Sequence, residues 1–110
     1  MLDRHIEKET KHFIEEIKET DVYRTYVVRL GRLKKDTQLM EQVNEYRRRN
    51  FEIQNSPQNG DLMDRIDDLE RQFEYLRENP MVDDFLNAEL ALCRMMQEVN
   101  NLITEELHFE

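Results

Sequence analysis

The spacing of the apolar residues is the feature that most limits what this chain can fold into. Along most of the sequence they recur three and four positions apart, so that a helix would gather them on one side. Only two glycines and two prolines are present, which leaves few places for tight turns. Glu, Leu, Arg, Gln and Met, which favour helices, are abundant. The sequence therefore predicts an all-α fold.

Interruptions in this pattern predict about five helices in an antiparallel bundle. Residues 1–110 have room for a single domain. Residues that cap helices well stand before four of the expected starts: Asp3, Asp36, Asp61 and Asn79. Thr20 and Asp21 interrupt the pattern before the second helix. The segment 55–60 collects the residues that turns prefer and predicts the main loop. The expected helices cover roughly residues 3–18, 22–35, 37–55, 61–79 and 80–107.

The last of these helices is expected to be the longest and to have the widest apolar surface. Asn79 caps its start and Pro80 suits a first helical position. At 1.5 Å per residue it would be roughly 42 Å long, against roughly 27 Å for its neighbour. So short a chain has few helices to cover it, so we predict a homodimer or tetramer built on the last two helices. The expected interface residues are Leu69, Phe73, Leu76, Val82, Phe85, Leu86, Glu89, Leu92, Met96, Val99 and Ile103.

Glu89 interrupts the apolar seam of that helix. Heptad counting from Val82 and Phe85 puts it on the seam, where a carboxylate needs a partner. An Arg from another helix or from another subunit would provide one and would fix the register. Alternatively, the helix rotates Glu89 to the rim of the interface, and the sequence does not distinguish the two arrangements.

The charge and cysteine content favour a cytoplasmic protein. No segment approaches the ~20 apolar residues of a membrane span, so we expect no membrane insertion. The amino terminus has no apolar stretch like that of a secretory signal. Cys93 is the only cysteine, which rules out an intrachain disulfide, and its apolar helix predicts a small buried side chain.

Basic residues on two helices leave one alternative function open. The net charge of −9 opposes attraction to nucleic-acid phosphates. The run Arg47, Arg48 and Arg49, with the Arg and Lys residues of the second helix, could nevertheless contact RNA. The other interpretation is that these side chains alternate with acids on solvated faces.

The residue types needed for catalysis do not occur together in this sequence. A nucleophile held by a base and an orienting group is not evident, nor is a glycine-rich phosphate loop. Two Glu-x-x-His spacings occur, Glu9–His12 and Glu105–His108, but the first lies off the apolar side of its expected helix and the second near the carboxyl-terminal end, whereas di-metal bundles need such pairs facing inward on several helices. We therefore expect a non-catalytic protein with no metal and no cofactor.

The carboxyl-terminal third carries an ordered set of motifs. It has an Asn-Pro start at 79–80, the aromatic Phe85 before Leu-x-Ala-Glu, and then Met-Met-Gln-Glu and Asn-x-Leu-Ile up to Ile103. Upstream lie Val22-Tyr-Arg-Thr-Tyr26 and Leu33-Lys-Lys-Asp-Thr-Gln-Leu39. Together these segments resemble the YlbF/YmcA family of small bacterial helical proteins, and the resemblance covers most of the chain.

The resemblance implies a helical, self-associating regulatory protein. Some members act with sister proteins to influence competence, sporulation and biofilm formation, by modulating mRNA processing by the membrane-bound endoribonuclease RNase Y. Certain members join complexes that carry iron-sulfur clusters through several cysteines, and Cys93 alone does not provide that set. Our hypothesis is a non-catalytic adaptor that binds itself and protein partners, and the alternative is a direct RNA-binding module.

Overall fold

A computed structural model describes residues 1–55 and 61–108. Within these ranges the chain forms six helices and no strand, which confirms the all-α prediction. The turn-rich segment expected at 55–60 lies, apart from Asn55, outside the described residues. The helices are α1 (Arg4–Lys18), α2 (Asp21–Lys34), α3 (Thr37–Asn55), α4 (Leu62–Gln72), α5 (Glu74–Arg77) and α6 (Pro80–Glu106).

One expected helix is divided in two. The pattern over residues 61–79 predicts a continuous helix, but α4 ends at Gln72 and the short α5 begins at Glu74. Phe73 lies between them, with φ −110° and ψ 12°. Its ring lies 5.5 Å from that of Tyr46, centroid to centroid, so tertiary packing of this side chain accompanies the break. The remaining helices begin and end within a few residues of their expected bounds.

Side-chain caps account for most of these starts. Asp3, Thr20, Asp36 and Asn79 each accept hydrogen bonds from backbone N–H groups in the first turn of the following helix. Such a bond satisfies one of the donors that a helix start leaves without a partner. Asp61 is the exception, because its side chain makes no capping hydrogen bond to α4. Asp61 stands at the expected N-cap position, but its side chain does not cap the helix.

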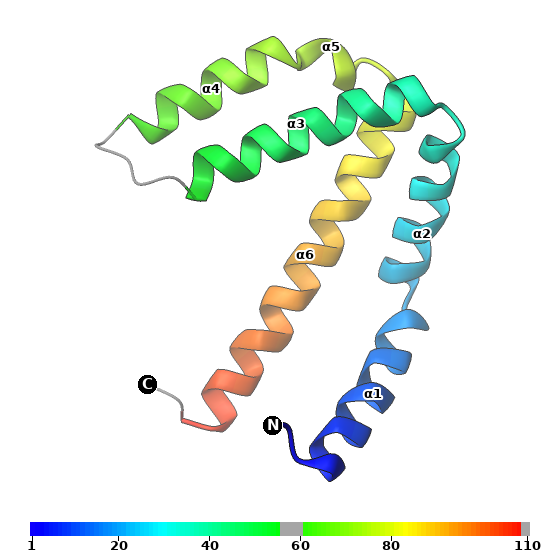
Figure 1. The fold of residues 1–110 in the computed structure, drawn as a ribbon, viewed down its shortest axis with the longest axis vertical. Coiled ribbons are helices and arrows are strands. Elements are labelled where there is room, and N and C mark those ends of the chain that lie inside the picture. The colour runs from blue at the N-terminus through cyan, green and yellow to red at the C-terminus, as the bar shows by residue number, and fades with distance from the viewer. Residues whose placement is uncertain (56–60, 109–110) are drawn as a thin grey trace.

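The helices are arranged as two antiparallel pairs that meet at one end of the molecule (Figure 1). α2 runs beside the first half of α6, and α3 runs beside α4. The two pairs lie at a wide angle to each other. Away from their junction, α1 and the second half of α6 extend as two separate arms.

The hydrophobic core lies where the two pairs meet. Its fully enclosed side chains come from α2, α3, α4 and the start of α6. α1 contributes no buried residue, and the buried residues of α6 all lie between Val82 and Ala88. The core consists of Leu33, Val43, Tyr46, Ile53, Leu69, Leu76, Val82, Phe85 and Leu86.

Candidate interaction surfaces

α1 presents an apolar face that the rest of the described chain leaves largely open. Ile6, Phe13, Ile14 and Ile17 fall on one side of this helix by their spacing. Phe13 and Ile14 are each 42% exposed and Ile6 is 50% exposed. The polar side carries local ion pairs such as Lys11 with Glu7, so the helix is amphipathic but its apolar side is not covered.

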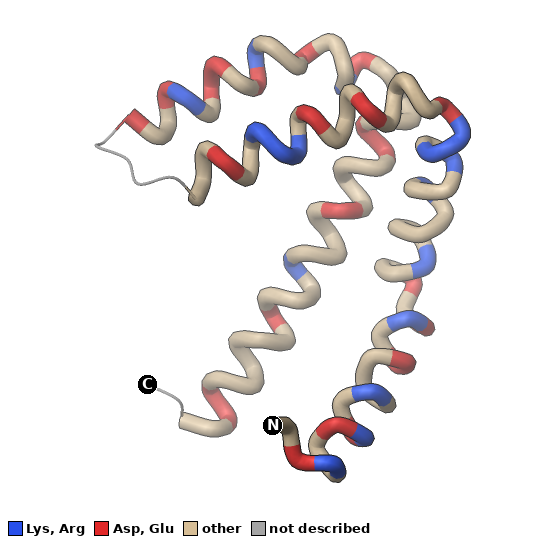
Figure 2. Tube along the Cα trace, viewed as in Figure 1, with Lys and Arg blue, Asp and Glu red and all other residues tan. Residues whose placement is uncertain are grey.

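The second half of α6 is unusual in a different way. Between Leu90 and Thr104 the only charged residues are Arg94 and Glu98, although none of this stretch is buried. A solvent-facing helix normally carries many charges. Figure 2 shows the contrast between this part of α6 and the alternating charges of α1. Its apolar residues are Leu90, Leu92, Met95, Met96, Val99, Leu102 and Ile103, half-buried or exposed.

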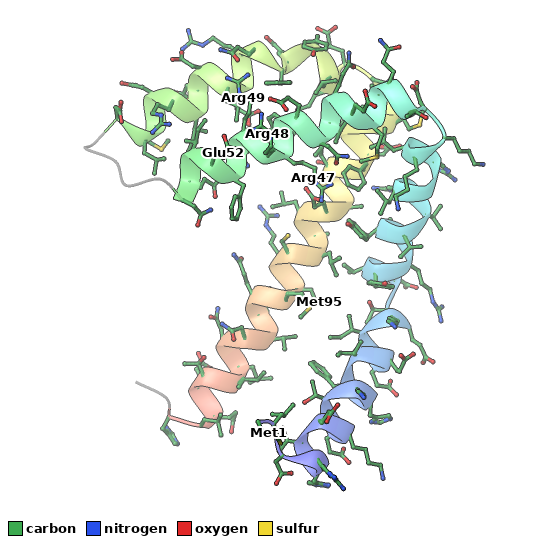
Figure 3. The ribbon with its side chains drawn as sticks, in the orientation of Figure 1. Met1, Arg47, Arg48, Arg49, Glu52 and Met95 are labelled. Carbon is green, nitrogen blue, oxygen red and sulfur yellow. The ribbon has the colours of Figure 1, made fainter. Side chains whose placement is uncertain are left out.

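These two segments, α1 and residues 90–107 of α6, are named the α1–α6 arms. Met95 projects from α6 toward the side on which α1 lies (Figure 3). Cys93, expected to be buried, is exposed on this arm, and that expectation was wrong because the side of α6 that carries Cys93 is left open within the described chain.

The structure separates the predicted interface residues into two groups. Leu92, Met96, Val99 and Ile103 lie on the α6 arm, half-buried or exposed. Five others are enclosed in the core of the chain itself and cannot face a second chain unless that core opens: Leu69, Leu76, Val82, Phe85 and Leu86. Phe73 is half-buried beside that core, at the break between α4 and α5.

Glu89 is paired within the chain. Its Oε2 lies 2.7 Å from Nη2 of Arg47 on α3, and both side chains are partly exposed. The Arg47 guanidinium also lies 5.4 Å from the centroid of the Phe85 ring, in a cation–π arrangement. The partner of Glu89 is therefore an Arg from another helix of the same chain, and the pair joins α3 to α6.

Each arginine of the run on α3 contacts different partners within the chain (Figure 3). Arg48 bridges Glu45 and Glu52 on its own helix, at 2.5 and 2.6 Å. The Arg49 guanidinium lies 5.4 Å from the centroid of the Phe73 ring. Because Arg47 is paired with Glu89, these three side chains do not form a single cationic patch.

A part-buried polar contact that the sequence did not indicate joins α3 to α4. The Tyr46 hydroxyl donates a hydrogen bond to the Glu70 carboxylate. Burial, and then this bond, raise the pKa of Tyr46 above its ordinary value, and Arg77 partly offsets them. The apolar spacing assigned Tyr46 to the core correctly, but it gave no indication of which acid would meet its hydroxyl.

The described residues hold no cluster suited to metal chemistry. Across residues 1–55 and 61–108, no group of three or more His, Cys, Asp or Glu side chains is placed to hold a metal ion. Within those same ranges no helix is both long and apolar enough to pass through a bilayer. What the surface does offer is uncovered apolar helix, which suits the binding of other chains.

Residues 6–108 match a family model described as control of competence regulator ComK, YlbF/YmcA. The chain belongs to this family. The match confirms the resemblance carried by the motifs between Asn79 and Ile103. The description of the YlbF/YmcA family is a regulatory one, the control of a competence regulator.

Two curated bacterial proteins, both named UPF0342 protein, are similar to this YlbF/YmcA-family chain. The one from Desulfitobacterium hafniense is 30% identical over 95 residues, which cover 84% of this chain and 77% of the relative. The one from Caldicellulosiruptor bescii is 19% identical over 96 residues, 86% of this chain and 81% of the relative. No solved structure gives a significant match.

Proposed function

We propose that this protein is a non-catalytic regulatory adaptor that acts by binding protein chains, beginning with a second copy of itself through the α1–α6 arms. The observation that carries the proposal is the stretch of α6 from Leu90 to Thr104, in which no residue is buried and only Arg94 and Glu98 are charged. Apolar helix left open to water is unfavourable, and burial against another chain removes that cost.

A second copy fits these arms for two physical reasons. α1 has 15 residues and the free part of α6 is similar in length, so each arm spans roughly 25 Å and can be matched along its whole length by an arm of the partner. Two chains of charge −9 also repel each other. Contact that includes residues 90–104 of α6, of which only Arg94 and Glu98 are charged, keeps that repulsion small, and a two-fold interface reuses the same patch on both copies.

The adaptor role rests on family membership and on the charged exterior that such a dimer would keep. The family description names the control of a competence regulator. Within the proposal, the dimer, alone or with sister YlbF/YmcA-like proteins, modulates RNase Y-dependent mRNA processing and through it competence, sporulation or biofilm development. At its compact end, α3, α4 and α5 carry acidic and basic side chains that are available to an RNA-processing complex.

Direct RNA binding through α3 has less support. Phosphate contacts require guanidinium groups that are free to approach the backbone. Arg47 and Arg48 are ion-paired within the chain, and Arg49 lies over Phe73. Binding of a single-stranded RNA that falls steeply with salt, and is lost when these three arginines become Gln, would favour this alternative.

The test of self-association is sedimentation equilibrium at micromolar concentration. The unaltered protein is expected to be a dimer or a tetramer, and the double variant Met96→Glu, Leu102→Glu is expected to be a monomer. The matched control is Phe51→Glu, which adds a charge at an exposed apolar residue outside the arms and should leave the oligomer intact. Circular dichroism checks that each variant remains helical. A monomeric unaltered protein, or a double variant that still associates, contradicts the proposal.

A further inference from the structure

The side of α2 that faces away from the core is basic. From residue 22 to residue 35 the chain has five Arg and Lys residues and no Asp or Glu, in a protein whose net charge is −9. Tyr26, Leu30 and Leu33 of this helix pack in or against the core. Helical spacing puts the following residues on the opposite side, named here the α2 outer face: Arg24, Val27, Val28, Gly31, Arg32 and Lys35.

The cations of this face are not neutralised within the chain. Among residues 1–55 and 61–108, no ion pair reaches Arg24, Arg32 or Lys35. Arg29, at the edge, donates from Nη1 to the backbone oxygen of Asp84 at 2.9 Å and so fastens α2 to α6. The other helices mix acids with bases or are mainly acidic (Figure 2). The basic charge of this face is thus available to an external anion.

The face is also apolar and open in its middle. Val27 and Val28 are 46% and 52% exposed. A Cβ built on Gly31 would meet nothing within 4 Å, so packing inside the chain gives no reason for a glycine there. A glycine within a helix costs about 1 kcal/mol relative to alanine. A shallow hollow of about 280 Å³ lies on this side of α2 and is lined by Arg24, Thr25, Val28, Arg29 and Arg32.

We propose that the α2 outer face docks an acidic amphipathic helix of a protein partner. Gly31 lets the partner backbone approach closely, and Val27 and Val28 meet its apolar side chains. Arg24 and Arg32 are eight residues apart, about 12 Å along the helix, and pair with carboxylates at the same separation on the partner. This inference goes beyond self-association, because it uses a surface separate from the α1–α6 arms.

The chemistry of the face favours such a helix over RNA. RNA phosphates would contact only the cations of this face. A closely packed helix would also contact the exposed Val27 and Val28 and would benefit from the absence of a side chain at Gly31. Single-stranded RNA binding also relies on aromatic rings on which bases stack. The α2 outer face has no aromatic residue, and the Tyr26 ring is directed to the core, 5.7 Å from the Phe85 ring between centroids.

The test is fluorescence anisotropy with three labelled probes. The first is a synthetic helix of roughly 20 residues built from Ala and Leu with Glu eight positions apart, long enough to form a helix in water. The second is the same peptide with Lys in place of Glu, and the third is oligouridylate RNA. The unaltered protein should bind only the Glu peptide, more weakly as salt is added. Binding of the RNA in preference to the Glu peptide, or of neither, overturns the proposal.

Two sets of variants locate the binding. Arg24→Glu with Arg32→Glu should weaken binding of the Glu peptide by about tenfold or more. The control with the same change of charge is Arg48→Glu with Arg71→Glu, on exposed side chains of α3 and α4, and it should bind nearly as the unaltered protein does. Equal loss in both variants would mean a general charge effect and would overturn the assignment to α2.

Gly31→Leu separates close helix docking from simple charge attraction. Leucine favours a helix more than glycine does, so this variant should unfold at an equal or higher temperature. It should nevertheless bind the Glu peptide about tenfold more weakly, because the side chain fills the approach path. If Gly31→Leu binds the Glu peptide with unchanged affinity, the proposed close approach of the partner backbone to Gly31 is overturned. All these variants should have the same oligomeric state as the unaltered protein in sedimentation equilibrium. A failure of the proposed docking on the α2 outer face can therefore be told apart from a failure of the proposed self-association through the α1–α6 arms.

Discussion

The compact end of the molecule and its two arms have the same kind of sequence but very different packing. At the compact end, Leu33, Val43 and Phe85 are wholly enclosed, with no measurable exposure. On α1 the apolar residues recur just as regularly, yet that helix has no buried residue. The comparison shows that an amphipathic pattern specifies a helix and a face that must be covered. It does not specify which chain provides the cover.

The largest expected effect lies at the compact end. Phe85→Ala should lower the free energy of unfolding by about 3–5 kcal/mol, because it leaves a cavity among fully buried side chains. Urea denaturation followed by circular dichroism measures it. A loss below about 1 kcal/mol would mean that this end is as loosely packed as the arms.

The next effect concerns the polar contact between α3 and α4. Tyr46→Phe removes the hydroxyl that donates to Glu70 and should destabilise the protein by about 1–3 kcal/mol, because a half-buried carboxylate loses a donor. Glu70→Gln keeps a side-chain acceptor for that hydroxyl and is the milder companion variant. If Glu70→Gln costs more than Tyr46→Phe in the same urea titration, the hydroxyl is not what matters.

The same contact predicts a dependence on pH. The fold raises the pKa of Tyr46, so it favours the neutral phenol. The stabilisation is therefore complete below the ordinary tyrosine pKa of about 10 and is lost as the pH rises through the raised value. Denaturation midpoints measured from pH 8 upward should fall more steeply for the unaltered protein than for Tyr46→Phe. Parallel curves would refute this contribution of Tyr46.

The ion pair that joins α3 to α6 should have a smaller effect. Arg47→Gln removes a partly exposed salt bridge to Glu89 and the contact with Phe85, at a cost of about 1 kcal/mol. Arg71→Gln, which loses a more exposed pair with Asp68, is the matched control and should cost less. The comparison is by thermal unfolding, and equal losses would show that Arg47 adds no more than a surface charge.

The smallest effect is expected on the arms of the dissociated chain. Ile14→Ala should change the free energy of unfolding by less than about 0.5 kcal/mol when the protein is dilute, because this side chain is 42% exposed. At higher protein concentration the difference from the unaltered protein should grow, since association stabilises only chains that can pair. If the difference in unfolding free energy between Ile14→Ala and the unaltered protein does not vary with protein concentration, the arms are not covered by association, and the contrast with the compact end is contradicted.

How far the sequence predicted this molecule depends on whether the decisive contact is local. Asp3, Asp36 and Asn79 act on the turn that follows them, so their roles as caps could be predicted. The break at Phe73 could not, because it accompanies packing against Tyr46 on another helix.

The same limit applies to the candidate interface. Val82 and Ile103 fit one stripe on α6, but only the placement of α2 and α5 beside the start of α6 buries the first and leaves the second exposed. Arg48 has acids three and four positions away on its own helix and could be expected to pair locally. The contact of Arg47 with Glu89 spans two helices, and spacing along one helix gives no information about it.

The continuity of α6 has a mechanical consequence. The helix is fixed in the core near Val82 and continues without a break to Glu106, so beyond the Arg47–Glu89 pair it is a stiff rod roughly 25 Å long. A tilt of about 5° at that pair would move the far tip by about 2 Å, as a lever turns about its fulcrum. A partner that grips the tip would thus exert a torque on the junction of the two helix pairs.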